Sequence, residues 1–222
     1  MRFIIDNLHK FELKCRHCTL KREFMRLYLA TTNKGKVREI KYYFGDVDVL
    51  AYTDVIDAFE IEENEDTFAG NALIKARAVF KALNDENAFV LSDDSGISVP
   101  LLGNAPGIYS ARYAGVDASD RDNLLKLKAS VLKQNVKSTP AYYTAAIALV
   151  SRYGEQVVHG WMHGDVITEE RGTNGFGYDP IFIPNGYTQT LGELGDDIKK
   201  KISHRAQALD LAHILLKGSY DK

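Results

Sequence analysis

A polar segment near the N-terminal end has the residues of a phosphate-binding loop, namely Thr31, Thr32, Asn33, Lys34, Gly35 and Lys36. It lies between a predicted strand at 26–30 and a predicted helix at 36–44, and such a junction directs backbone N–H groups at one point. The two lysines add positive charge, and the glycine permits close approach of the backbone. The spacing is not that of a Walker A loop. We therefore predict a triphosphate site here, with a capped polar turn as the alternative.

Carboxylates that suit a Mg²⁺ ion occur in two places. One is an acidic segment with Glu60, Glu62, Glu63, Glu65 and Asp66. The other is the pair Asp93 and Asp94, directly after an apolar run at 88–91 that we expect to be a strand ending at Ser92. Adjacent carboxylates repel each other, and a hard cation held between them and a phosphate removes that repulsion. A solvated acidic face and an ordinary turn are the alternatives.

An aromatic residue and two polar side chains complete the set. Phe176 lies between two glycines in the segment 172–180, where an exposed ring can stack on a nucleotide base. His204 and Arg205 begin a predicted helix and can donate hydrogen bonds to a carbonyl oxygen or a phosphate. Core packing of the ring and the usual polarity of a first helical turn are the alternatives. Together, the four segments fit a nucleoside triphosphate better than any other common ligand.

Strand and helix patterns alternate along the chain and must bring these segments together. Helical periodicity predicts helices at 36–44, 67–83, 119–133 and 203–217, the second of them capped by Asp66 or Thr67. β-rich runs predict strands at 26–30, 47–52, 88–91, 142–153, 156–161 and 165–168, with a further short run at 178–183. Consecutive strands without helices in the middle indicate an α/β fold with a mixed sheet. In such folds, polar residues at strand ends hold the ligand.

The composition is that of a globular protein. The 222 residues are 45% hydrophobic and 26% charged, and 28 Lys and Arg against 30 Asp and Glu leave a net charge of −2. Nucleic-acid-binding domains are normally basic, so we expect no nucleic-acid partner. The longest apolar run, Ala145–Val150, is far below the roughly 18 residues of a membrane helix. Because a signal-peptide pattern is also missing, we expect a cytoplasmic protein without a membrane partner.

Residues 1–24 differ from the rest of the chain. They contain both cysteines, Cys15 and Cys18, spaced like half of a zinc site, with His17 between them rather than downstream. Because a complete site needs four ligands, we expect no zinc. We predict a flexible extension, or a start codon assigned too early with Met25 as the true first residue. So few cysteines also exclude a secreted disulfide scaffold.

Six ordered segments resemble the inosine/xanthosine triphosphate pyrophosphatase family, which removes deaminated purine nucleotides. They lie at 30–36, 67–76, 92–96, 103–115, 175–182 and 202–205. The resemblance covers residues 26–217 and leaves a tail at 218–222. It implies an elongated, two-lobed α/β fold around a long, mixed, twisted sheet with flanking helices, and it implies a homodimer. It also implies Mg²⁺-dependent hydrolysis of dITP, ITP, XTP or dXTP to the monophosphate and pyrophosphate in a cleft between the lobes.

The resemblance further implies the roles of the catalytic and metal-binding residues. Asp94 would bind Mg²⁺ and act as the general base, and Asp93 could share that work. Glu63, or else Glu62, would be the second metal ligand. Lys75 would face the phosphates from the helix predicted at 67–83.

The nucleotide would be held by the remaining residues of these motifs. The triphosphate would bind to residues 31–36, and Ser95 would touch the nucleotide. Phe176 would stack on the purine, and its pocket would be shaped by Gly177, Tyr178 and Asp179. Recognition of the base and the phosphates would be completed by Lys199, His204 and Arg205. Donors at His204 or Arg205 would favour the O6 acceptor of hypoxanthine and xanthine over the amino group of adenine.

Two positions depart from the pattern Gly-x-Thr-Phe-x-Glu-Asn-Ala that the family usually has. Here Glu65 replaces the glycine and Gly70 replaces the glutamate, which leaves the conformation of the metal loop open. Two other functions stand beside the implied one: a pyrophosphatase for other modified nucleotides, and a nucleotide-binding module without turnover. Phe176 and the segment 203–205 favour purines over pyrimidines, and the paired aspartates with the acidic segment favour an enzyme.

Overall fold

The computed structural model describes residues 26–45 and 47–220, so the predicted extension with Cys15 and Cys18 lies outside the described residues. The strands are β1 (Arg26–Leu29), β2 (Asp48–Ala51), β3 (Phe89–Ser98), β4 (Ser138–Ser151), β5 (Gly154–Ile167) and β6 (Phe182–Pro184). The α-helices are α1 (Lys34–Tyr43), α2 (Phe68–Leu83), α3 (Asp120–Leu132), α4 (Asp196–Ile202) and α5 (His204–Tyr220). Short 3₁₀ turns are η1 (Tyr52–Asp54), η2 (Pro100–Leu102), η3 (Gly107–Arg112) and η4 (Asp179–Ile181).

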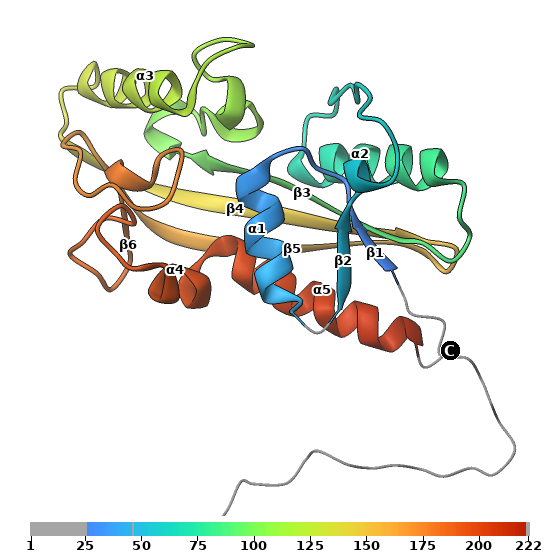
Figure 1. The fold of residues 1–222 in the computed structure, drawn as a ribbon. Coiled ribbons are helices and arrows are strands. Elements are labelled where there is room, and N and C mark those ends of the chain that lie inside the picture. The colour runs from blue at the N-terminus through green and yellow to red at the C-terminus, as the bar shows by residue number, and fades with distance from the viewer. Residues whose placement is uncertain (1–25, 46, 221–222) are drawn as a thin grey trace, which may run out of the picture.

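The strands form one mixed sheet in the order β2-β1-β3-β4-β5-β6. β1 is parallel to β2 and β3, and the other neighbours are antiparallel. α2 packs on β3 and β4 from one side, and α5 packs on β4 and β5 from the other (Figure 1). α3 lies near the opposite end of the long β4–β5 hairpin from α2, which gives an elongated, two-lobed outline. The predicted α/β fold with a long mixed sheet and flanking helices is confirmed.

Alternate side chains of the sheet pack against different helices. In β1, Leu27 and Leu29 join the apolar core with α1 and α5, whereas Tyr28 joins the core with α2. β3 continues this alternation, with Leu91 on the α5 side and Val90 on the α2 side. Successive side chains of a strand point to opposite faces. The face on which each later residue of β3 lies is therefore fixed by its position.

β3 is longer than predicted. It continues through Asp93 and Asp94 to Ser98, so the prediction that the strand ends at Ser92 was wrong. β4 pairs with the whole extension, placing Asp93 opposite Ile147 and Asp94 opposite Ala146. Aspartate is normally depleted in strands, and here cations from the flanking helices compensate for both carboxylates. The two aspartates consequently lie on opposite faces of the sheet, not together at a strand end.

β5 is a single strand where two were predicted, at 156–161 and 165–168. The glycines in this region serve close packing. A Cβ at Gly160 would collide with the carbonyl oxygen of His204 in α5, and one at Gly164 with that of Ile183 in β6. Without side chains, these positions let the backbones of α5 and β6 approach β5 closely.

Helix ends largely follow the predicted signals. Thr67, rather than Asp66, caps α2, because its Oγ1 accepts a hydrogen bond from the N–H of Gly70. Ser119 caps α3, as predicted. α4 was not predicted, and α5 continues to Tyr220, into the predicted tail. Among the described residues, no helix is long and apolar enough to cross a membrane.

Candidate active site

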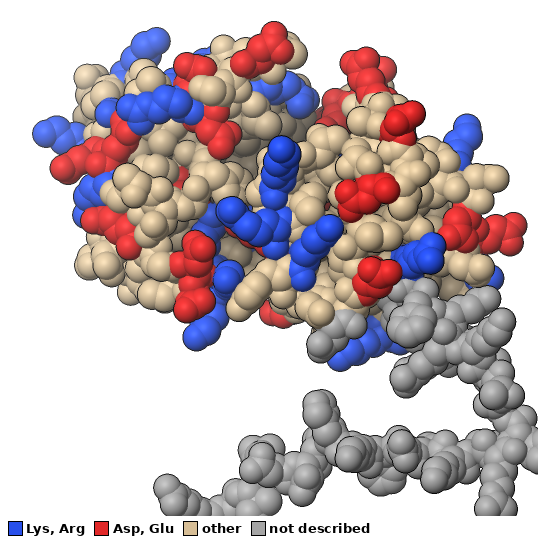
Figure 2. All heavy atoms as spheres, viewed as in Figure 1, with Lys and Arg blue, Asp and Glu red and all other residues tan. Residues whose placement is uncertain are grey.

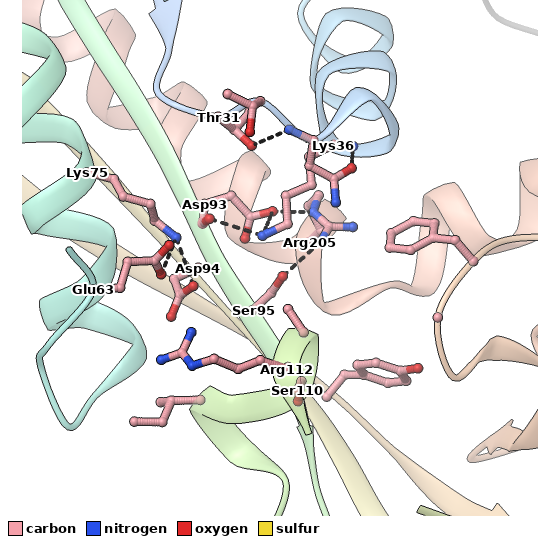
Figure 3. Close-up of a pocket in the computed structure, with 18 of the residues that line it drawn as sticks. Thr31, Lys36, Glu63, Lys75, Asp93, Asp94, Ser95, Ser110, Arg112 and Arg205 are labelled. Atoms are coloured by element: carbon pink, nitrogen blue, oxygen red, sulfur yellow. Dashed lines mark hydrogen bonds and ion pairs between the residues drawn. The ribbon is translucent and has the colours of Figure 1, made fainter. Parts of the chain in front are cut away.

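The candidate site opens where β1 ends and β3 continues. The last pair of β1 joins Leu29 to Leu91, and the Ala30 N–H still donates to the Leu91 carbonyl at 2.8 Å. Beyond this point, no strand from the described part of the chain pairs with β3 on its β1 side, and a cavity of about 430 Å³ lies there. It is lined by the loop after β1, by β3, by η3, and by the segments that contain Phe176 and Arg205 (Figure 3).

On the α5 face of β3, Asp93 is enclosed by cations. Its Oδ2 accepts a hydrogen bond from Arg205 Nε at 2.6 Å and lies 3.5 Å from Lys36 Nζ. Lys36 Nζ also donates to the Asp93 backbone carbonyl at 3.1 Å. Burial alone would raise the pKa of Asp93, but Arg205 and Lys36 outweigh it and hold that pKa well below its usual range. Asp93 is therefore a buried, ionised carboxylate at the cavity wall, with its charge balanced by Arg205 and Lys36.

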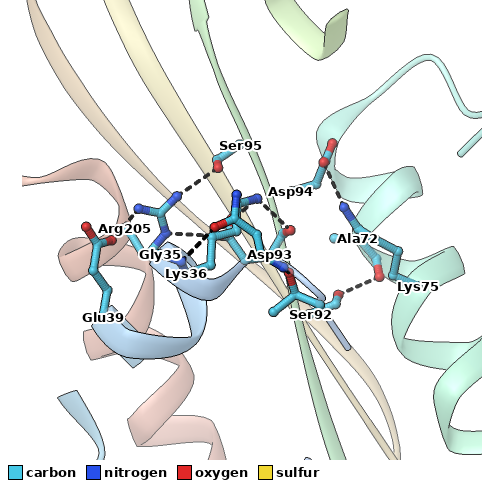
Figure 4. Close-up of polar contacts among 12 residues, drawn as sticks. Gly35, Lys36, Glu39, Ala72, Lys75, Ser92, Asp93, Asp94, Ser95 and Arg205 are labelled. Atoms are coloured by element: carbon cyan, nitrogen blue, oxygen red, sulfur yellow. Dashed lines mark hydrogen bonds and ion pairs between the residues drawn. The ribbon is translucent and has the colours of Figure 1, made fainter. Parts of the chain in front are cut away.

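Arg205 is bound to the protein through several donors. Besides the bond to Asp93, its Nη1 donates to Glu39 at 2.5 Å and its Nη2 donates to Ser95 Oγ at 3.0 Å (Figure 4). Glu39, on α1, was not among the predicted residues. Such a network ties α5, β3 and α1 together at the floor of the cavity.

On the α2 face of β3, Asp94 and Glu63 share one cation. Lys75 Nζ donates to Asp94 Oδ1 at 2.9 Å and to Glu63 Oε2 at 3.0 Å. Burial raises the pKa of Asp94 in spite of Lys75. Burial lowers the pKa of Lys75, but the two carboxylates outweigh this effect and the pKa is raised. Lys75 thus remains charged and holds both carboxylates at the cavity wall.

The carboxylates on this face have the donor set of a Mg²⁺ site. The second oxygen of Asp94, Oδ2, is buried and has no hydrogen-bond partner among the described residues. Mg²⁺ is usually held by one or two carboxylates together with water and substrate phosphates. Glu63 and Asp94 fit this pattern, and within the described ranges no group of three or more His, Cys, Asp or Glu suggests an all-protein metal site. Glu62 is exposed and does not line the cavity.

Phe176 is held at the other end of the cavity by Asp179. The Phe176 N–H donates to Asp179 Oδ2 at 2.8 Å, and Lys199 Nζ donates to the same oxygen at 2.6 Å. Lys199 Nζ also lies 4.5 Å from the centroid of the Phe176 ring. Gly175 has a φ of 78°, and a Cβ there would strike the Asp179 carboxylate. This loop therefore requires glycine and presents a half-buried ring in a fixed place.

His204 is buried in the wall of the cavity. Its ring stacks on Tyr143 with centroids 4.7 Å apart and planes at 12°. Burial, assisted by Arg205, holds the pKa of His204 well below its usual value, so the ring is neutral. A neutral imidazole has one N–H donor. Its Nδ1 has no partner in the described part of the chain.

Most of the predicted site residues meet in this one cavity. Its lining includes Thr31, Thr32, Asn33, Lys36, Glu63, Lys75, Asp93, Asp94, Ser95, Phe176, Gly177, Tyr178, Asp179, Lys199, His204 and Arg205. Lys34, Gly35 and Glu62 do not line it. Lys34 is exposed on α1, where Figure 2 shows Lys and Arg side chains gathered over the middle of the molecule.

Sequence reasoning missed several lining residues. Ser110 and Arg112 come from η3, within the segment 103–115 that carried the resemblance without an assigned role. Ser110 links β3 to the loop of Phe176, because Tyr178 Oη donates to its carbonyl at 2.7 Å. Asp120, at the start of α3, accepts a bond from the Gly177 N–H at 3.1 Å. Only the pairing of distant segments reveals these contacts.

Comparisons with known proteins identify the family of this chain. The model of the Ham1 family matches residues 27–213. A protein of Sulfurimonas denitrificans named dITP/XTP pyrophosphatase is 61% identical over 196 residues, covering 86% of this chain and 98% of that protein. A protein of the same name from Nautilia profundicola is 58% identical, and the match covers 87% of this chain and 98% of that protein. The solved structure of the Staphylococcus aureus Ham1 protein matches with a TM-score of 0.77 and 36% identity, covering 87% of this chain and 99% of that one.

Proposed function

The chain belongs to the Ham1 family, and on that basis we propose that it hydrolyses non-standard purine nucleoside triphosphates, dITP or ITP and XTP or dXTP, to the monophosphate and pyrophosphate. Its relatives named dITP/XTP pyrophosphatase match it over nearly their whole length. The observation that carries the proposal is the Glu63–Lys75–Asp94 cluster in the same cavity as the loop that contains Lys36. A triphosphate hydrolase needs carboxylates that can hold a metal ion and cations that can bind the phosphate groups.

The triphosphate would lie between the loop 31–36 and η3. Asn33 fixes the loop by accepting bonds from the N–H groups of Gly35 at 2.9 Å and Lys36 at 3.2 Å. Lys75 and Arg112 line the cavity and add positive charge. Cations that are already positioned bind phosphate oxygens through strong, charge-assisted hydrogen bonds.

Hydrolysis would use the acidic side of the cavity. Glu63 and Asp94 would hold Mg²⁺, which when bound offsets negative charge on the phosphate oxygens. Asp94 would also accept a proton from the attacking water, because it lines the cavity and burial raises its pKa, which makes it the stronger base of the two aspartates. The water oxygen then bonds to phosphorus as the bridge between the α- and β-phosphates breaks, and pyrophosphate leaves. Asp93 would position Arg205 and Lys36 rather than move a proton.

The base would stack on Phe176, within reach of polar groups from Asp179, Lys199 and His204. Hypoxanthine and xanthine present an oxygen at position 6, which accepts a hydrogen bond, whereas adenine presents an amino donor there. An N–H donor facing this edge would leave two donors opposed in the adenine complex, which costs about 1–3 kcal/mol.

A homodimer in the cytoplasm is the corresponding proposal for assembly and location. On the α2 side of the sheet, an open groove between α2 and η3 exposes Trp161 and Tyr109, and His159 stacks on Trp161 with centroids 5.5 Å apart. Large exposed aromatic side chains around one groove are typical of a protein interface. We place the dimer contact at this groove.

Product analysis tests the proposed reaction. The purified protein is incubated separately with dITP, XTP, dGTP and ATP, with Mg²⁺ and with EDTA, and the products are separated by ion-exchange chromatography. We expect monophosphate and pyrophosphate from dITP and XTP, little product from ATP or dGTP, and none in EDTA. Diphosphate with orthophosphate would contradict the reaction. Faster turnover of another modified nucleotide would favour the alternative substrate class, and binding without products a binding module.

A further inference from the structure

The side chain of Glu65 occupies the space beside Gly70, the third residue of α2. A Cβ placed on Gly70 would lie 2.6 Å from Glu65 Cβ, 2.8 Å from Glu65 Cγ and 3.0 Å from Thr67 Oγ1. The first two distances are shorter than carbon atoms tolerate. Because Glu65 Cβ is fixed to the backbone, rotation of the side chain cannot relieve the contact. Any side chain at position 70 must therefore displace the backbone at Glu65.

The loop that contains Glu65 is tied to α2 and carries Glu63. The Glu65 N–H donates to the buried Asn71 side chain, Oδ1, at 3.1 Å. Two residues earlier, Glu63 pairs with Lys75, which also lies on α2. A shift at Glu65 is thus transmitted along one short segment to the Glu63 carboxylate.

The two departures from the usual family pattern occupy these same two positions. The usual residues are glycine at 65 and glutamate at 70. Glu65 is not among the described residues with positive φ, so the backbone here does not require glycine. Glycine at 65 is required only if residue 70 has a side chain. In the usual pattern, the glutamate would also complete a capping box with Thr67, whose side chain already accepts from Gly70.

We infer that Glu65 and Gly70 are one compensated exchange, and that their fit positions the loop that holds Glu63 at the cavity. Position 70 does not accept a side chain, including the usual glutamate, unless residue 65 becomes glycine, whereas glycine at 65 meets no such obstacle. The steric coupling is independent of the proposed function. Only its consequence for the metal ligand Glu63 rests on that function.

Thermal unfolding in EDTA tests the coupling without metal or substrate. Gly70→Ala should lower Tm by roughly 3 °C or more. In a Glu65→Gly background, the same substitution should cause no loss, because both colliding carbons are gone. In a Glu65→Ala background, most of the loss should remain, because Cβ is retained. Gly218→Ala is the matched control, since this helical glycine has nothing within 4 Å of an added Cβ.

The inference is overturned if Gly70→Ala behaves like Gly218→Ala, or if Glu65→Ala relieves the loss as fully as Glu65→Gly. Thermal unfolding can give either result even if the protein hydrolyses no nucleotide, so this test does not depend on the proposed function.

A second measurement tests the effect on Glu63. Mn²⁺ binding, followed by electron paramagnetic resonance, and the Mg²⁺ concentration for half-maximal hydrolysis are compared in three proteins. We expect Gly70→Glu to weaken metal binding at least fivefold, and the double exchange Glu65→Gly with Gly70→Glu to restore it. Equal metal binding in the wild type and Gly70→Glu would refute positioning of Glu63, and so would an unrestored double exchange that folds normally.

Discussion

Asp93 and Asp94 are neighbours in the chain, but they lie on opposite faces of β3 and meet different cations. Asp93 is bonded to Arg205 at 2.6 Å on the α5 face, and Asp94 is bonded to Lys75 at 2.9 Å on the α2 face. Asp93 belongs to a buried ion network with Arg205 and Lys36, whereas Asp94 shares Lys75 with Glu63. We therefore propose that Asp93 positions its cationic partners and that Asp94 takes part in the reaction.

This division predicts different losses for the two aspartates. Asp94→Asn should lower kcat by about 10²-fold or more, because the group that accepts the proton is lost, with little change in stability. Asp93→Asn should lower the free energy of unfolding by about 3–5 kcal/mol, because it removes the carboxylate that Lys36 pairs with and one of the two carboxylates that pair with Arg205. Steady-state kinetics and urea unfolding measure the two effects. Equal residual rates with equal stabilities would contradict the assignment.

The two candidate glutamates should differ in their response to metal. Glu63→Gln should raise the Mg²⁺ concentration for half-maximal activity by about tenfold or more, a loss typical even of outer-shell partners. Glu62→Gln is the matched control and should behave like the wild type, because its side chain is exposed outside the cavity. Mg²⁺ titrations at saturating dITP check this. A larger rise in the required Mg²⁺ concentration for the Glu62 variant would identify Glu62, rather than Glu63, as the metal ligand.

Arg112 should act on the phosphates and not on the base. Arg112→Gln should lower kcat/KM by about 10–100-fold, the equivalent of one charge-assisted hydrogen bond of about 1.5–3 kcal/mol. The loss should be equal for dITP and XTP. Arg121→Gln is a control, since Arg121 pairs with Glu170 away from the cavity. A change in the dITP to XTP ratio would argue that Arg112 reads the base.

Stability should fall at mildly acidic pH because of His204. Its pKa in the folded protein is well below the ordinary value near 6.5, owing to burial and then to Arg205. The unfolded chain therefore binds the proton more readily. The stabilisation is fully present above pH ~6.5 and is lost as the pH falls, by up to ~1.4 kcal/mol per unit.

Unfolding free energies measured from pH 7.5 to 5.5 check the role of His204. His204→Phe keeps an aromatic ring against Tyr143 and should flatten the pH slope. His163→Gln, at an exposed histidine, should leave the slope unchanged. An unaltered slope in the His204 variant would exclude this origin of acid sensitivity.

The groove with Trp161 should be the dimer contact. Trp161→Arg should convert a dimer to a monomer in sedimentation velocity, because a buried charge at an interface is costly. Tyr153→Arg is the control, since Tyr153 is also exposed but lies at the β4–β5 turn outside the groove. A Trp161→Arg protein that remains dimeric would place the contact elsewhere.

The sequence by itself determined most of the helices and strands and the types of reactive residue in the site. Hydrophobic periodicity located α1, α2, α3 and α5, and cap residues such as Thr67 and Ser119 marked helix starts, because these signals are local. The ordered motifs identified the family, and they contain Asp94, Lys75 and Phe176. The polarity of Asp93 and Asp94 led to a predicted strand end at Ser92, although both residues continue β3.

Only the tertiary structure decided which residues meet. Long-range strand pairing carries β3 past the end of β1, and alternation along β3 sends Asp93 to Arg205 and Asp94 to Lys75. The choice of Glu63 for the cavity, the presence of Arg112 in its wall and the fit of Glu65 against Gly70 follow from the same packing. Such contacts join segments far apart in the chain or depend on a close three-dimensional fit, and neither local propensity nor spacing encodes them.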